Sequence, residues 1–131
     1  MKRARKSVTD AELGVLKALW KEGPSTIRQL TDLLYPGGGT SCYATVQKLL
    51  DRLESKSYVR RRPRGRVNVY TATVDRQALI AGRLRETADR LCDGSLTPVL
   101  TQLVGSGELT PRELAALREL VVRQDRAKSG R

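Results

Sequence analysis

The sequence predicts a mainly α-helical fold that includes one small β-hairpin, in the α+β class. Three helical patterns come first, and an extended, arginine-rich stretch follows them after Ser57. Helical patterns return from Asp75 onward. Each piece is common by itself, but three helices followed by a hairpin is the order of a winged helix-turn-helix. We therefore expect an N-terminal winged helix-turn-helix domain with a helical region behind it.

The first helix is predicted over residues 10–22. Thr9 and Glu12 stand three residues apart, which is the spacing of a capping box. One stripe at helical spacing then carries the apolar residues Leu13, Leu16, Leu19 and Trp20. Gly23 and Pro24 follow this stripe and end the helix.

The second and third helices form the predicted helix-turn-helix pair. Ser25 is the expected cap of the second helix, whose inward residues are Ile27, Leu30, Leu33 and Leu34. The glycine-rich stretch Pro36-Gly37-Gly38-Gly39 connects it to a third helix, for which Ser41 is the expected cap. The third helix points inward with Val46, Leu49, Leu50 and Leu53, and its opposite face carries Ala44, Gln47, Lys48 and Asp51.

A β-hairpin is predicted after the third helix. Tyr58-Val59 leads into a run of arginines, and Pro63-Arg64-Gly65 supplies turn residues. The stretch Val67-Asn68-Val69-Tyr70-Thr71 alternates with β-branched residues, as a half-buried strand does. In a winged helix-turn-helix this hairpin is the wing, and the third helix is the recognition helix.

Three short helices are predicted from Asp75 onward. Asp75 caps the first of them, Thr97-Pro98 starts the second, and Thr110, Pro111 and Glu113 give the third a strong start signal. Their apolar faces are too large for so short a segment to bury alone, so we expect a second copy of the chain to cover them. The expected dimer contacts are Leu100, Leu103, Val104, Leu114, Leu117, Leu120 and Val121.

These patterns divide the chain into four parts. We expect a basic flexible tail, a winged-helix domain, a helical dimerisation region and a frayed C-terminus over residues 1–8, 9–74, 75–124 and 125–131.

The charge of the chain favours a polyanionic partner. The net charge is +11, and 15 of the 25 Lys and Arg residues lie in residues 1–74 with only 6 of the 14 acidic residues. The excess is concentrated in Lys2-Arg3-Ala4-Arg5-Lys6 and in the hairpin arginines from Arg60 to Arg66. Either run can be merely solvated, but arginines held close together repel each other unless an anion relieves them.

Composition excludes several other classes of protein. The chain has no histidine, and Cys42 and Cys92 lie far apart, so we expect no catalytic residue, no metal site, no cofactor and no disulfide framework. A small enzyme is therefore a weak alternative. Apolar runs do not exceed four residues, so we expect no membrane insertion and no secretory signal. A non-specific, architectural nucleic-acid-binding protein stays open as an alternative.

The outer face of the third helix has residue types that read bases. Gln can pair with adenine and Lys with guanine in the major groove, which makes Gln47 and Lys48 candidates for base contacts. Ala44 and Thr45 can meet a thymine methyl group, and Tyr43 can donate to a phosphate or pack against the connector. Arg62, Arg64 and Arg66 of the hairpin are expected to contact phosphates.

The chain resembles the BlaI/MecI-type penicillinase repressor family over residues 8 to about 124. The resemblance rests on Thr9 to Trp20, Tyr43 to Leu53 and Gly65 to Tyr70. It implies a cytoplasmic, bacterial nucleoid-associated homodimer that represses transcription from inverted-repeat operators in double-stranded DNA. The positions that it implies for DNA contact are Ala44, Thr45, Gln47, Lys48, Arg52, Gly65 and Arg66.

The sequence also departs from that family. Ser57 stands where its members usually have Gly at the end of the recognition helix. The penicillin-responsive members are cut by a membrane sensor protease at an Asn-Phe bond, and the aligned pair here is Gln102-Leu103. Cleavage by such a protease and a different inducing signal both stay open. The clustered cysteines of related copper-responsive repressors are lacking, so copper sensing is not implied.

Overall fold

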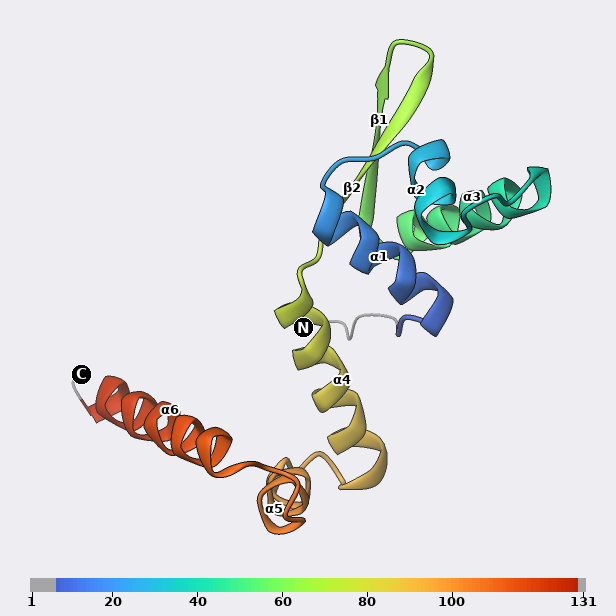
Figure 1. Cartoon of the computed structure of the whole chain (residues 1–131). Helices are drawn as coiled ribbons and strands as arrows, with labels where there is room; N and C mark the ends of the chain where they lie inside the picture. The colour runs from blue at the N-terminus through green and yellow to red at the C-terminus, as the bar shows by residue number, and fades with distance from the viewer. Residues whose placement is uncertain (1–6, 130–131) are drawn as a thin grey trace. The chain divides into compact units, whose positions relative to one another are not determined.

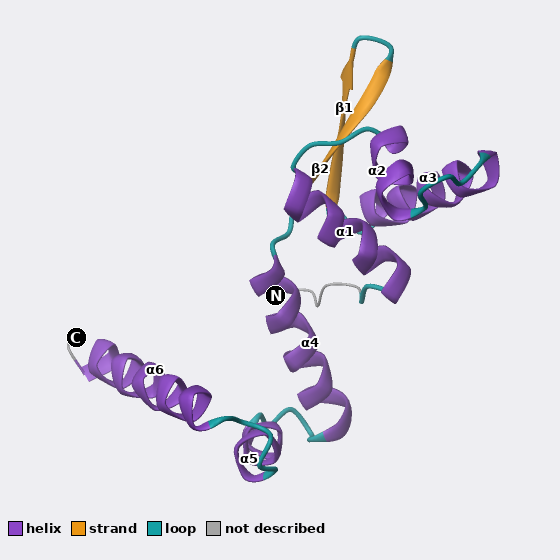
Figure 2. Cartoon of the chain, viewed as in Figure 1, coloured by secondary structure: helices purple, strands orange, loops and turns teal. Residues whose placement is uncertain are grey.

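The structure, a computed structural model, describes residues 7–129 and divides the chain into two compact units. The first unit ends at Arg83 and the second begins at Leu84. Figure 1 labels the elements, which are α1 (Asp10–Glu22), α2 (Ile27–Leu34), α3 (Thr40–Ser55), β1 (Val59–Arg64), β2 (Val67–Ala72), α4 (Arg76–Leu91), α5 (Thr97–Gly105) and α6 (Pro111–Ser129). The basic run Lys2-Arg3-Ala4-Arg5-Lys6 lies outside the described residues. The prediction of helices, hairpin and further helices is confirmed (Figure 2).

Helix α1 begins and ends as predicted. The Thr9 hydroxyl accepts from the Glu12 amide at 3.2 Å, and a Glu12 carboxylate oxygen accepts from the Thr9 amide at 3.0 Å. Gly23 follows the helix with a φ of +82°, a conformation that glycine adopts without steric cost. The capping box and the glycine stop therefore set both ends of α1.

Two of the predicted helix caps are wrong. Thr26, not Ser25, caps α2, in a capping box with Gln29. Ser25 instead exchanges backbone hydrogen bonds with Tyr70, which attaches the segment before α2 to the hairpin. Helix α3 starts at Thr40, one residue before the expected cap Ser41, and its N-cap Gly39 makes no side-chain hydrogen bond.

The wing is a two-stranded antiparallel hairpin with a shorter turn than predicted. Arg64 pairs with Val67, so the turn consists of Gly65 and Arg66 alone. Pro63 and Arg64 belong to β1 rather than to the turn. Gly65 has a φ of +63°, which a two-residue hairpin turn requires at its first position and which glycine supplies.

One hydrophobic core joins the helices of the first unit to the base of the hairpin. Its most deeply buried side chains come from all of these elements, and they include Val15, Leu16, Leu30, Val46, Leu50, Leu53, Tyr58 and Tyr70. The expected inward residues of α3 are all buried. Leu33 of α2, by contrast, is 45% exposed, so its predicted inward position is wrong.

The second unit differs in kind because it has almost no buried interior. Helices α5 and α6 have no buried residue, and Ala88 is the buried residue of α4. The division between units falls inside α4, whereas the sequence placed it before Asp75. Helix α6 continues to Ser129, so residues 125–129 are helical rather than frayed as expected. None of the helices within residues 7–129 is long and apolar enough to cross a membrane.

Candidate nucleic-acid interface

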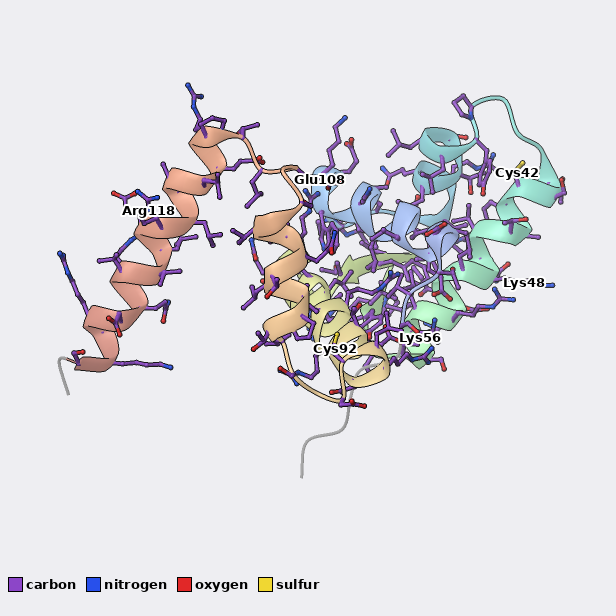
Figure 3. All side chains as sticks on the ribbon, turned by 90° about the horizontal axis from the view of Figure 1, so that it is seen from below. Cys42, Lys48, Lys56, Cys92, Glu108 and Arg118 are labelled. Carbon is purple, nitrogen blue, oxygen red and sulfur yellow. The ribbon has the colours of Figure 1, made fainter. Side chains whose placement is uncertain are left out.

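Helix α3 presents a continuous polar face to solvent. Val46, Leu49, Leu50 and Leu53 are held in the core, and this fixes the opposite side of the helix outward. The exposed side carries the predicted residues Ala44, Thr45, Gln47, Lys48 and Arg52. Figure 3 shows Lys48 extending away from the first unit. The core packing thus puts every one of these five candidates on an accessible face.

The start of α3 has a different environment. The ring of Tyr43 is half-buried against the core, and the guanidinium of Arg28 lies 5.7 Å from its centroid. Both residues line a cavity of about 330 Å³ between α2 and the start of α3, together with Thr31, Gly38, Gly39 and Thr40. The Thr45 hydroxyl donates to the Ser41 carbonyl at 3.0 Å, which leaves its methyl group and oxygen lone pairs for other contacts. No local pattern in the sequence connects α2 to Tyr43, so the sequence does not predict Arg28 at this place.

The hairpin divides its arginines between two faces. Residues that are opposite each other in an antiparallel pair share a face, and successive residues alternate. Arg61 pairs with Tyr70, which is buried, so Arg61 lies on the core face. Arg60, Arg62 and Arg64 pair with Thr71, Val69 and Val67 and therefore lie on the outer face. The hairpin arginines thus form a row of three with Arg66 at the turn, and Arg61 stands apart from that row.

Arg61 makes contacts within the protein. Its Nε lies 3.6 Å from a carboxylate oxygen of Glu54 on α3, and both side chains are partly exposed. Burial raises the pKa of the Tyr70 hydroxyl, and the neighbouring Arg61 cation opposes that rise. Arg61 therefore links β1 to the recognition helix.

The joint between α3 and the wing contains a strained residue. Ser57 has a φ of +67°, the left-handed conformation that costs a residue with a side chain about 1–2 kcal/mol. The neighbouring amides close the helix, since Ser57 N–H donates to the Glu54 carbonyl and Tyr58 N–H to the Leu53 carbonyl, each at 2.9 Å. The Thr73 hydroxyl donates to the Ser57 carbonyl at 2.7 Å. Ser57 thus occupies a left-handed position that favours glycine, and Thr73, the residue that follows β2, helps to hold it there.

The predicted dimer residues lie on exposed faces of α5 and α6. Leu117 is half-buried, and the exposed ones are Leu100, Leu103, Val104, Leu114, Leu120 and Val121. The Gln102-Leu103 bond lies inside α5. Cys42, near the start of α3 in Figure 3, and Cys92 are free thiols. Residues 7–129 contain no group of three or more His, Cys, Asp or Glu residues that could hold a metal ion.

Two curated proteins are similar to this chain over most of its length. The penicillinase repressor of Bacillus licheniformis is 27% identical over 116 residues, which cover 87% of this chain and 88% of that protein. An uncharacterized 16.5 kDa protein of Latilactobacillus sakei is 26% identical over 114 residues, which cover 87% of this chain and 77% of that protein. The solution structure of the DNA-binding domain of the repressor BlaI is 30% identical, with a TM-score of 0.48, and covers 60% of this chain and 93% of that one.

A family model shows which protein family the chain belongs to. The model described as "Penicillinase repressor" matches residues 8–123, a range that includes both the winged helix-turn-helix and the C-terminal helices. The chain therefore belongs to the penicillinase repressor family, whose members are DNA-binding transcriptional repressors and not enzymes.

Proposed function

We propose that this protein represses transcription by binding, as a homodimer, to an inverted-repeat operator in double-stranded DNA. The observation that carries the proposal is the polar face of α3 beside an arginine-bearing wing, in a member of a repressor family. Such an activity belongs on the bacterial chromosome, in the cytoplasm.

The two parts of the interface have different tasks in this proposal. Helix α3 enters the major groove, where Gln47 and Lys48 contact base edges and Ala44 and Thr45 meet thymine methyl groups. Arg52 lies one helical turn after Lys48, where α3 approaches the sugar-phosphate backbone of the DNA in this proposal. The wing contacts phosphates through Arg62, Arg64 and Arg66, and Gly65 lets its tip approach closely. Arg28 and the Tyr43 hydroxyl add a backbone contact at the other end of α3.

The homodimer is supported by the apolar surface of the second unit. The side chains of Leu100 and Val121 are 52% and 59% exposed, and their apolar neighbours on α5 and α6 are similarly exposed. Apolar patches of this kind on a small soluble protein mark an interaction surface. In a two-fold dimer each copy of the chain buries the apolar surface of the other. The dimer then has the two-fold symmetry that an inverted repeat requires.

We also propose that proteolysis of the dimerisation region relieves repression. Loss of α5 and α6 would leave each winged-helix unit bound to one half-site only, and operator occupancy would fall. The Gln102-Leu103 bond is helical, so a membrane sensor protease could cut it only after α5 unfolds locally. Intact mass spectrometry of the protein from induced cells tests this step. A fragment ending at Gln102 supports it, and unchanged mass overturns it in favour of another signal.

Footprinting on the DNA upstream of the protein's own gene tests the proposed function. We expect a protected inverted repeat whose half-sites are separated by about 10 bp or a multiple of it, bound far more tightly than a scrambled duplex. An architectural protein would instead protect DNA without a defined sequence. Equal affinity for the two duplexes would therefore contradict the repressor and favour that alternative.

A further inference from the structure

A buried ion pair joins the end of α3 to the start of α1. Lys56 Nζ lies 2.6 Å from Glu12 Oε1 and also donates to the Ser7 carbonyl at 2.9 Å. The Glu12 side chain is only 1% exposed, and that of Lys56 is 17% exposed. Glu12 Oε1 also accepts from the Thr9 amide, so one carboxylate oxygen binds both the N-cap of α1 and the end of α3.

This pair is a poor source of stability. Its second oxygen, Glu12 Oε2, is buried and has no hydrogen-bond partner among the described residues. Removing two charges from water costs several kcal/mol, and replacing a buried pair with neutral residues often leaves stability unchanged or improves it. The short, charge-assisted hydrogen bond does fix the position of one helix relative to the other, because it is directional and apolar contacts are not.

Lys56 lies at the junction between α3 and the wing. Lys56 is the C-cap of α3, immediately before the left-handed Ser57 and the wing. The buried leucines of α3 hold the helix on the core through apolar contacts, which are non-directional. Reading a base edge requires side chains placed within about 0.5 Å. The ion pair is a polar contact that ties the C-terminal end of α3 to α1.

We propose that Glu12 and Lys56 are positioning residues for DNA recognition, which fix α3 and the wing so that Gln47 and Lys48 meet their bases. The inference rests on the proposed function. It assigns the ion pair to operator selectivity and not to fold stability. Neither residue contacts DNA in this account.

The double variant E12Q/K56M tests this assignment. Glutamine keeps the capping box with Thr9, since Gln serves as well as Glu at that position, and the neutral pair leaves no uncompensated buried charge. The exposed pair of Glu86 and Arg90 on α4, 3.7 Å apart, provides the matched control E86Q/R90M. Affinities for the footprinted operator and for a scrambled duplex are measured for the full chain, together with urea unfolding.

We expect the operator-to-scrambled affinity ratio of E12Q/K56M to fall about fivefold or more, which is the discrimination that a single base contact provides. Its unfolding midpoint and its affinity for scrambled DNA should stay close to wild type, and the control should change nothing. The single variant E12Q leaves the Lys56 ammonium group, whose side chain is 17% exposed, within reach of water; it should lower the ratio as well and gives a second test if the double variant folds poorly. A ratio equal to wild type in folded variants would overturn this inference alone. A wild type without operator preference would overturn the proposed function too.

Discussion

Two neighbouring arginines of β1 should respond differently to the same substitution. Arg62 lies on the outer face of the wing opposite Val69, whereas Arg61 lies on the core face and contacts Glu54 of α3. In our account Arg62 contacts a DNA phosphate and Arg61 does not. Arg62→Ala and Arg61→Ala therefore form a matched pair that removes the same charge from adjacent positions.

The expected size of the difference follows from counterion release. Each phosphate contact adds about 0.9 to the negative slope of log affinity against log salt. Arg62→Ala should lower this slope by about 0.9 per protomer, so its deficit at 50 mM salt shrinks about 3.5-fold by 200 mM for each phosphate that the side chain no longer reaches. Arg61→Ala should leave the slope unchanged. That substitution removes a partly exposed ion pair, worth about 0–1 kcal/mol of stability.

Fluorescence anisotropy with labelled operator, titrated at several salt concentrations, measures both slopes. A scrambled duplex should show the same slope change for Arg62→Ala, because phosphate contacts are independent of sequence. If Arg61→Ala flattened the slope as much as Arg62→Ala, the assignment of the two faces would be refuted. An unchanged slope for Arg62→Ala would remove the outer face of the wing from the interface.

Three further changes have expected outcomes. Ser57→Gly should raise the free energy of unfolding by about 0.5–1 kcal/mol in urea denaturation, because glycine relieves the left-handed strain at its own entropic cost; a decrease would contradict the strain. Removing residues from Ser95 onward should give a folded monomer with much weaker operator binding; a truncated dimer in sedimentation would contradict the dimer assignment. Lys56→Met should cost about 3 kcal/mol of stability at pH 7, because it leaves the buried Glu12 carboxylate unpaired. Burial raises the pKa of Glu12, but the hydrogen bonds from Lys56 and Thr9 outweigh burial and hold that pKa below its ordinary value in wild type, so at pH 7 the carboxylate is charged and loses its counter-ion in Lys56→Met. The deficit of Lys56→Met should therefore shrink on acidification, and a deficit that does not change with pH would contradict the ion-pair explanation.

Local signals in the sequence predicted the elements of the fold well. Thr9 with Glu12 and Thr110 with Glu113 both form the capping boxes expected from their spacing. The apolar stripe of α3 is buried, and this alone placed the candidate contact residues outward. Such features depend on residues within one or two turns of each other, which is the range that sequence periodicity reports.

Errors arose where tertiary contacts decided the outcome. Ser25 has a good capping side chain, but its backbone pairs with Tyr70 and leaves the cap to Thr26. The hairpin arginines form one basic run in the sequence, yet strand alternation and the Glu54 contact separate Arg61 from the others. The link between Glu12 and Lys56 could not be predicted, because no local pattern connects residues on two different helices.

The most direct test of the central claim is the affinity of Gln47→Ala for operator and for scrambled DNA. The claim is that the outer face of α3 reads base edges. We predict a loss of about 1–3 kcal/mol per half-site on the operator and a much smaller loss on the scrambled duplex, because a base contact discriminates by that amount. An equal loss on both duplexes, or no loss on the operator, would contradict it.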